Sequence, residues 1–368
     1  MNPSYWRRRG AVALVACSMA MPAVPCTTFV TDGPDGPLFA RNYDFDFGEA
    51  LLVVNPRGLR KSADVPGQQA ATWTARHGSL TFNQYGVGFP TGGVNEAGVV
   101  VELMWLDGSR YPDADARPAV STLQFIQYLL DRSDSLPQAL EAAREVRIAG
   151  RTPLHFLVAD ATGRSATLEF LDGRLVVHQG QNLPVRVLAN DPYAQSISHL
   201  KRFNGFGGTQ PLPDDRSSLS RFVRAADRLR ERPAGVAPAF ATLDDVAQPG
   251  FTHWQIVYEL RRGRVHYRTA AQRAPRWVDL AQLDFGCAAG LRVMNIDEGQ
   301  GDRSARWRPY AQALNEAQLR VAYRKTAWMR QMSDEDVARS AQEDAAYPAT
   351  MRCDSGGAEE KSSADRGG

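Results

Sequence analysis

The sequence has little net charge, few histidines and few cysteines. Its 43 lysine and arginine residues face 41 aspartate and glutamate residues, a formal net charge of +2. A surface so close to neutral gives no electrostatic reason to expect binding to nucleic acid or to an anionic membrane. The six histidines and four cysteines show no metal-ligand spacing. We therefore expect no metal, no cofactor and no nucleic-acid partner.

Long apolar runs are also missing. The most apolar stretch, residues 10–20, is short and is followed by prolines, and no later stretch is long enough to span a bilayer comfortably. Three arginines at 7–9 precede it and small residues stand at 18 and 20, a pattern typical of a secretory signal. We expect residues 1–25 to be a signal peptide plus a short propeptide, and the protein to be periplasmic or secreted. An uncleaved N-terminal anchor is the alternative.

The 368 residues show no internal repeat and have an ordinary globular composition. Blocks of strand-like pattern alternate with blocks of helical pattern, rather than following a strict β-α-β order. This arrangement favours an α+β fold in which antiparallel sheets are stacked between helical layers. We expect a single domain over 26–353, a helical extension over about 305–345, and a disordered tail over 354–368.

The chain after the leader begins with a predicted hairpin. An apolar segment over 26–30 is followed by dense turn chemistry at 31–37 and a returning strand over 38–43. Further strands are predicted at 51–55, 80–85, 99–105, 154–159, 166–170, 175–178, 185–189, 254–260 and 264–269. Helices are predicted after the capping residue Ser121 and at 136–146, 217–230, 310–330 and 333–343.

Cys26 is the candidate nucleophile. If it becomes the first residue of the mature protein, it carries a thiol with a pKa of about 8.5 and an α-amine with a pKa of about 8. One residue then supplies both a nucleophile and a base near neutral pH, and no histidine is needed. His155 is the one histidine inside a predicted apolar strand, so its contacts test whether a histidine assists the thiol.

Three other residues fit the same chemistry. The hairpin brings Arg41 and Asp44 beside Cys26, where an arginine stabilises a thiolate and a carboxylate orients the amine. The alternative is an exposed ion pair of little consequence. Asn190, at a strand end before Asp191-Pro192, is a candidate oxyanion donor. Its alternative role is a local Asx turn.

The remaining cysteines leave two possibilities open. Cys17 would leave with the leader. Cys287 and Cys353 either form a disulfide in an oxidising compartment or remain a buried and a solvated thiol. In either case the mature chain holds an odd number of cysteines, which suits an unpaired, reactive Cys26.

Five short segments stand out when taken in order. They are Cys26-Thr27-Thr28-Phe29, the Arg-Asn-x-Asp segment 41–44, the Asn-Glu-x-Gly turn 95–98, the Ala-Asn-x-Pro segment 189–192 and the helix segment 220–226. Together they resemble the choloylglycine hydrolase and penicillin V acylase family of N-terminal-nucleophile hydrolases. The resemblance runs from Cys26 to about Thr269.

The resemblance implies a four-layer αββα fold and a role for each matched residue. Cys26 would be the nucleophile, Arg41 would lie near the sulfur and Asp44 would bind the free amine. The oxyanion would be held by the Asn190 side chain and by the backbone at Trp105. Arg221 would be the supporting arginine.

The resemblance also implies a small-molecule acyl-amide substrate, such as penicillin V, an acyl-homoserine lactone or a conjugated bile acid, cleaved at a linear C–N bond. Trp105 looks like the Gram-negative branch, and Phe45 stands where that branch often has tryptophan. Both predict an aromatic or long apolar acyl group, with core packing as their alternative role. The stretch between Asn190 and Arg221 lacks the long assembly loop of tetrameric relatives. A homo-oligomer is therefore possible, but its size is not predicted.

Processing at Cys26 has two possible routes. Pro25 is a poor residue for direct signal-peptidase cleavage, so we expect cleavage after Ala20 and autocatalytic removal of 21–25. The rival is a lipid-anchored or secreted binding protein with an acylated Cys26 and no catalysis. Ala23 and Pro25 depart from a lipobox, which has leucine three residues before the cysteine and a small residue just before it. An inactive member of the fold is a third possibility.

Overall fold

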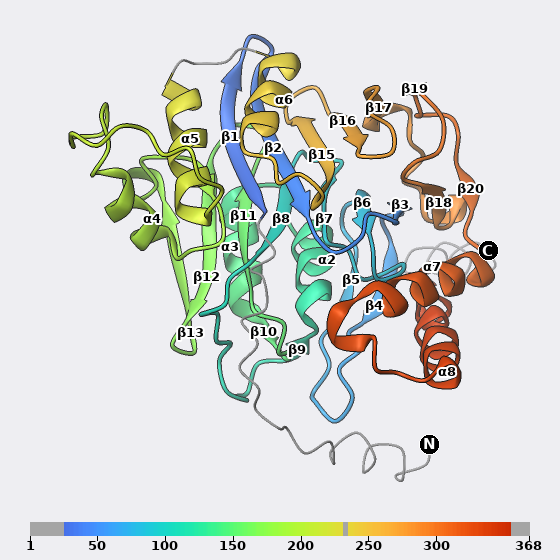
Figure 1. Cartoon of the computed structure of the whole chain (residues 1–368). Helices are drawn as coiled ribbons and strands as arrows, with labels where there is room; N and C mark the ends of the chain where they lie inside the picture. The colour runs from blue at the N-terminus through green and yellow to red at the C-terminus, as the bar shows by residue number, and fades with distance from the viewer. Residues whose placement is uncertain (1–25, 231–234, 355–368) are drawn as a thin grey trace, which may run out of the picture.

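The computed structural model describes residues 26–230 and 235–354 and is built on two large sheets (Figure 1). The first sheet has seven strands in the order β14-β1-β2-β15-β16-β17-β19, antiparallel except for the β17–β19 pair. Its strands are β1 (Thr27–Gly33), β2 (Gly36–Asp44), β14 (Val187–Leu188), β15 (Thr252–Glu259), β16 (Arg264–Thr269), β17 (Arg276–Asp279) and β19 (Gly301–Asp302).

The second sheet has nine strands in the order β13-β12-β11-β8-β7-β6-β3-β18-β20. They are β3 (Leu51–Asn55), β6 (Ser79–Asn83), β7 (Gly92–Asn95), β8 (Val100–Trp105), β11 (Leu154–Ala159), β12 (Ser165–Leu171), β13 (Arg174–Gln179), β18 (Arg292–Asn295) and β20 (Arg308–Pro309). Two small sheets join β9 (Ala119–Val120) to β10 (Arg147–Ile148), and β4 (Leu59–Ser62) to β5 (Thr72–Thr74) and β21 (Arg352–Cys353).

Helices cover the outer faces of both sheets (Figure 1). On the seven-stranded sheet, α5 (Ser218–Arg230) contacts β1, α6 (Val236–Asp245) contacts β2 and β15, and α4 (Tyr193–Leu200) packs on α5. On the nine-stranded sheet, α2 (Thr122–Arg132) contacts β7 and β8, and α3 (Leu136–Glu145) contacts β11. The expected αββα layering is confirmed. Near the C-terminus α7 (Gln312–Lys325) and α8 (Asp334–Ala345) pack on each other.

The position of strand β8 between two cores explains why its sequence is almost continuously apolar. Val100 and Met104 belong to the core between the two sheets, whereas Val101 and Leu103 belong to the core under α2 and α3. Successive side chains of a strand point to opposite faces, so a strand covered on both faces must be apolar at nearly every position. Fully burying a side chain of this size contributes roughly 1.5–3 kcal/mol.

Element boundaries differ from the predictions mainly at turns. The cap of α2 is confirmed, because the Ser121 side chain accepts a hydrogen bond from the Gln124 backbone. The strand predicted at 80–85 ends at Asn83, whose side-chain amide donates to Gly86 O and holds a turn there. The patterns do not predict α4 or α6. A helix-disfavouring proline, Pro192, precedes α4, and another, Pro238, lies within α6.

Cys287 and Cys353 form a disulfide with a Cα–Cα distance of 5.9 Å, which settles the alternative left open by the sequence. Cys26 is the free cysteine of the described ranges. Asp354 donates its backbone N–H to Gly58 O. The predicted leader over 1–25 and positions 355–368 of the predicted tail lie outside the described residues. Within 26–230 and 235–354, no helix combines the length and apolar character needed to cross a bilayer.

Candidate active site

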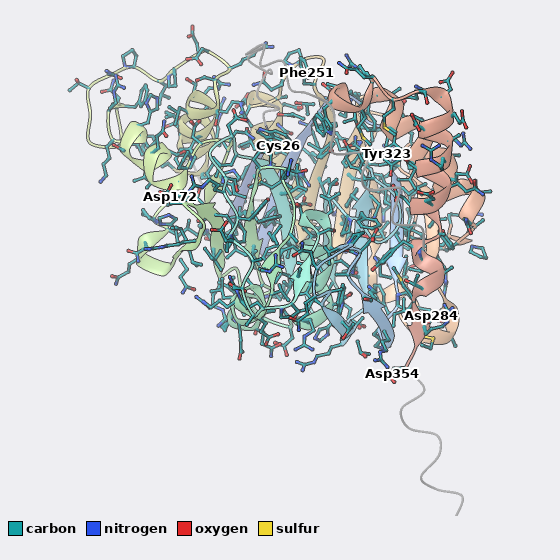
Figure 2. All side chains as sticks on the ribbon, turned by 90° about the horizontal axis from the view of Figure 1, so that it is seen from below. Cys26, Asp172, Phe251, Asp284, Tyr323 and Asp354 are labelled. Atoms are coloured by element: carbon teal, nitrogen blue, oxygen red, sulfur yellow. A yellow bond between two sulfur atoms is a disulfide. The ribbon has the colours of Figure 1, made fainter. Side chains whose placement is uncertain are left out.

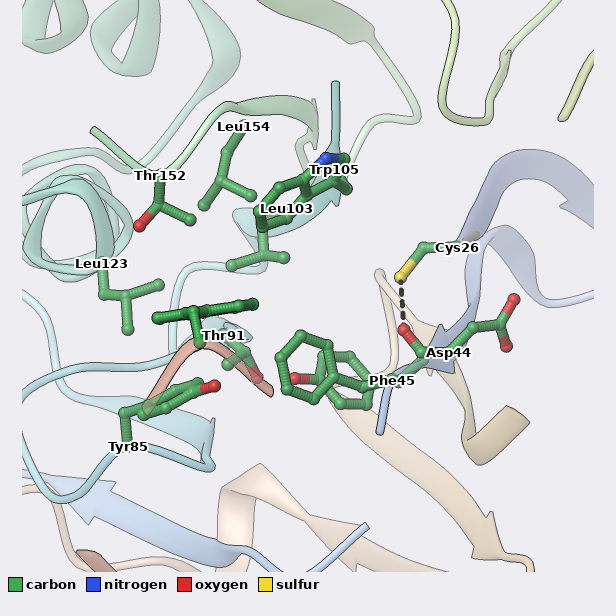
Figure 3. Close-up of a pocket in the computed structure, with 12 residues that line it drawn as sticks. Cys26, Asp44, Phe45, Tyr85, Thr91, Leu103, Trp105, Leu123, Thr152 and Leu154 are labelled. Carbon is green, nitrogen blue, oxygen red and sulfur yellow. Dashed lines mark hydrogen bonds between the residues drawn. The ribbon is translucent and has the colours of Figure 1, made fainter. Parts of the chain in front are cut away.

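Cys26 lies at the start of β1, a strand paired with β14 on one side and β2 on the other. The side chain is only 2% exposed, and its Sγ lies 3.6 Å from the Asp44 carbonyl oxygen (Figure 3). The register places Arg41 opposite Thr28. The hairpin therefore brings Arg41 and Asp44 beside Cys26, as the sequence predicts. Figure 2 labels Cys26 near the middle of the molecule as seen from below.

Arg41 is fully buried, so the exposed ion pair considered from the sequence is wrong. Its guanidinium donates to the carbonyls of Thr91 (2.8 Å) and Leu103 (2.9 Å) and pairs with the Glu102 carboxylate. Burial raises the pKa of the Cys26 thiol, and the charge of Arg41 opposes that rise. Arg41 is thus the cation that favours a thiolate at this position.

Glu102 is a partner that the sequence reasoning missed. It occupies the face of β8 that points between the sheets, and its carboxylate accepts hydrogen bonds from Arg41 and the Tyr258 hydroxyl. A Cβ at Gly92 would collide with the Glu102 carboxylate, so only glycine leaves room for it. A lone acid inside an apolar strand is the signal that would have identified it, since a buried charge needs a partner.

Asp44 is also fully buried, and its two carboxylate oxygens differ. Oδ1 accepts a hydrogen bond from the Thr252 hydroxyl at 2.5 Å. Oδ2 has no hydrogen-bond partner among the described residues. Burial raises the pKa of Asp44 to about 7, although the charge of Arg221 acts in the opposite direction. A buried carboxylate with an unused acceptor needs a cationic donor in order to stay ionised.

Asn190 and Arg221 complete the polar part of the site. The guanidinium of Arg221, on α5, donates to Cys26 O at 2.6 Å and to Asn190 Oδ1 at 2.8 Å. Asn190 Nδ2 donates to Trp105 O at 2.8 Å. Arg221 therefore links the Asn190 side chain to the nucleophile segment, and Asn190 is not confined to a local Asx turn. The two positions expected to hold an oxyanion, Asn190 and Trp105, lie side by side.

His155 is a buried core residue rather than a partner of the thiol. Its Nε2 lies 2.8 Å from Ala189 O and its Nδ1 lies 3.2 Å from Glu169 Oε1. These contacts support the strand end that carries Asn190. Across the described part of the chain, no cluster of three or more histidine, cysteine or acidic side chains is arranged to hold a metal ion.

An apolar cavity of about 170 Å³ opens beside the polar residues. Figure 3 shows Cys26 and Asp44 at one side of it, with Leu123 and Tyr85 at the other. Phe45 and Trp105, both predicted to contact the acyl group, line the cavity. Phe45 is 7% exposed and makes an edge contact with Tyr85, so it belongs to the core as well as to the cavity wall. Sequence patterns did not identify Tyr85 or Trp328 as lining residues.

The sequence model for linear amide C–N hydrolases, choloylglycine hydrolase family, matches residues 26–289. The chain belongs to this family. It is therefore an amidohydrolase that acts on linear amides. The region that matches the family begins at Cys26. Residues 290–354, which include α7 and α8, lie beyond the matched region.

Individual relatives agree with this assignment. A penicillin V acylase of Pectobacterium atrosepticum is 26% identical over 332 residues, covering 76% of this chain and 88% of that protein. The solved penicillin V acylase of Agrobacterium tumefaciens is 26% identical, has a TM-score of 0.69 and covers 78% of this chain and 98% of its own. A variant of the conjugated bile acid hydrolase of Clostridium perfringens shares the fold at 19% identity, with a TM-score of 0.63 over 75% of this chain and 98% of its own.

Proposed function

We propose that the mature protein begins at Cys26 and hydrolyses acyl amides through a thioester on that cysteine. The observation that carries this proposal is a buried carboxylate oxygen, Asp44 Oδ2, which has no hydrogen-bond partner among the described residues. The backbone carbonyl of the same residue lies 3.6 Å from the free thiol of Cys26. In the full chain the Cys26 nitrogen is part of the peptide bond to Pro25 and is not basic. Cleavage of that bond creates an ammonium group beside Asp44, which supplies the cationic donor that this carboxylate lacks.

The first half of the reaction forms the thioester. The neutral α-amine of Cys26 takes the proton from Sγ, and the thiolate attacks the carbonyl carbon of the amide. The resulting ammonium then gives its proton to the departing amine as the C–N bond breaks, leaving the acyl group on Sγ. Arg41 stabilises the thiolate, and Asp44 orients the ammonium.

The second half releases the acid. The α-amine accepts a proton from water, and the hydroxide oxygen attacks the thioester carbonyl carbon. The C–S bond breaks, the proton returns to sulfur and the carboxylic acid leaves. In both halves the carbonyl oxygen carries negative charge, which Asn190 Nδ2 and the backbone N–H of Trp105 would stabilise. One such donor is typically worth about 10²–10³-fold in kcat.

The proposed substrate is an amide with an aromatic acyl group, of the phenoxyacetyl type found in penicillin V. Both 26%-identical relatives are penicillin V acylases, and Phe45, Tyr85 and Trp105 line the cavity with rings. Aromatic walls favour flat apolar groups through offset and edge contacts. Acyl-homoserine lactones are the second candidate and conjugated bile acids the third.

We further propose export to the periplasm or outside the cell, with cleavage after Ala20 and autocatalytic removal of 21–25. The rival, a lipid-anchored binding protein, would require a diacylglyceryl group on the Cys26 sulfur. The depth of that sulfur, in a side chain only 2% exposed, disfavours such a group.

The test combines intact mass, N-terminal sequencing and turnover. We expect a first residue of unmodified Cys26 in the active protein, and hydrolysis of penicillin V. Cys26→Ala should lower kcat by about 10⁴-fold or more, as the loss of a nucleophile does in other covalent enzymes. A mature protein that starts elsewhere, or a variant that keeps wild-type turnover, would refute the proposal.

A further inference from the structure

Trp328 lines the acyl cavity although it comes from a part of the chain beyond the family match. It lies in a short 3₁₀ turn, Ala327–Met329, between α7 and α8. Its ring lies 5.9 Å from that of Trp105 and 6.2 Å from that of Phe45, measured between centroids. The side chain is nevertheless 46% exposed. One side of the indole therefore contacts the cavity wall while the other meets solvent.

The segment that carries Trp328 is fastened to the turn at 84–87. The Thr326 hydroxyl shares a hydrogen bond of 2.9 Å with the hydroxyl of Tyr85, itself a cavity residue. On α7, Gln318 Nε2 donates to Gln84 O at 3.0 Å, and Asn315 Oδ1 accepts from Val87 N at 2.9 Å. These polar contacts hold the 3₁₀ turn in one position over the cavity. Figure 2 labels Tyr323, on α7, to the right of Cys26 in the view from below.

The size of the cavity limits what it can hold with Trp328 in place. A volume of about 170 Å³ is close to that of an apolar cavity of about 150 Å³ that binds one benzene molecule in another protein. One aromatic ring therefore fits within this volume, whereas a long alkyl chain or a fused-ring acyl group would extend beyond it toward solvent. Trp328 lines the cavity and is partly exposed, so such a group would meet its indole on the way out.

We infer that Trp328 is a specificity-determining residue that closes the acyl site and selects acyl groups ending in a single ring. This inference rests on the proposed function, since it concerns the acyl half of the same reaction. It assigns a role to the segment after 289: α7 and α8 place one indole at the mouth of the cavity. The chemistry at Cys26 does not require that indole, but the choice of acyl group does.

The test compares two amides that release the same amine, one with a phenoxyacetyl group and one with a dodecanoyl group. We expect Trp328→Ala to lower kcat/KM for the phenoxyacetyl amide about tenfold and to raise it for the dodecanoyl amide by a similar factor. Differences of this size are typical of gained or lost apolar contacts in a binding pocket. Trp328→Phe should give an intermediate ratio, because it keeps a smaller ring.

Gln331→Ala is the matched control, because Gln331 is exposed in the same segment and does not line the cavity. It should leave the ratio of the two kcat/KM values within twofold of wild type. An unchanged ratio in Trp328→Ala, or an equal change in Gln331→Ala, would overturn the inference.

A binding measurement separates failure of this inference from failure of the proposed function. Calorimetry with the two product acids, phenoxyacetate and dodecanoate, needs no turnover. If neither amide is hydrolysed but Trp328→Ala still shifts the affinity ratio toward dodecanoate, the proposed reaction fails and the role of Trp328 stands. If the amides are hydrolysed and neither ratio moves, the reaction stands and the role of Trp328 is overturned.

Discussion

The two ends of the acyl site are built in different ways. At the polar end, Cys26, Arg41 and Asp44 lie at or on adjacent strands and are at most 2% exposed. At the apolar end, Trp105 ends a strand and is only partly buried, while Trp328 stands on a 3₁₀ turn and is 46% exposed. The reacting groups are thus fixed by sheet register, whereas Trp328 lies on a turn outside both sheets, where the chain can change without disturbing them.

Breaking the support of the polar end should have the largest effect on stability. Glu102→Gln leaves the fully buried guanidinium of Arg41 without its carboxylate. Loss of one partner of a buried ion pair typically costs about 3–5 kcal/mol. We expect a decrease of that size in the free energy of unfolding, measured by urea titration.

The matched control is Asp115→Asn, which breaks the exposed pair between Asp115 and Arg117. Exposed pairs contribute about 0–1 kcal/mol, so little change is expected. Trp328→Ala should also stay within about 1 kcal/mol of wild type, since its side chain is nearly half exposed. Equal losses in all three variants would remove the contrast between the two ends.

A change at Asn190 sharpens the contrast in catalysis. Asn190→Ala removes the side-chain donor beside Trp105 and should lower kcat by about 10²–10³-fold, with a much smaller change in KM. Trp328→Ala, in contrast, should change the preference between acyl groups. Steady-state kinetics with penicillin V measure the effect.

Asn204→Ala, in an exposed loop, is the control and should keep kcat within twofold of wild type. An Asn190→Ala variant that raises KM and leaves kcat intact would show that Asn190 binds the substrate and does not stabilise the oxyanion.

The pH dependence of stability tests the protonation of Asp44. Its folded pKa of about 7 lies above the ordinary value of 3.8, so the folded chain keeps a proton that the unfolded chain releases. Stability should therefore fall as pH rises from about 4 to about 7, by at most about 1.4 kcal/mol per pH unit from this group.

Asp44→Asn should remove this contribution. The comparison is best made in the Cys26→Ala chain, where Asp44 faces no free amine, by urea titration at several pH values. Parallel pH profiles for the two chains would contradict the raised pKa of Asp44.

Much of the polar end was predictable because its signals are local. The turn-rich hairpin fixes which residues of β1 and β2 stand opposite each other, and this alone places Arg41 and Asp44 near Cys26. The pairing of Arg41 with Glu102 was not predicted, since the two residues are 61 positions apart and on different sheets. Tyr85 and Trp328 were missed for the same reason: their own segments carry no sign of the distant surface they meet.

The sequence by itself determined which groups meet at the polar end: one cysteine, with an arginine and an aspartate returned to it by a short hairpin, in a family that cleaves linear amides. Only the tertiary structure decided which acid neutralises Arg41, that Cys287 bonds to Cys353, and that a C-terminal tryptophan closes the acyl cavity. Pairing within a hairpin follows from strand register, which the sequence encodes locally. Contacts between layers depend on how side chains from distant segments fill a shared space, and no single segment encodes that.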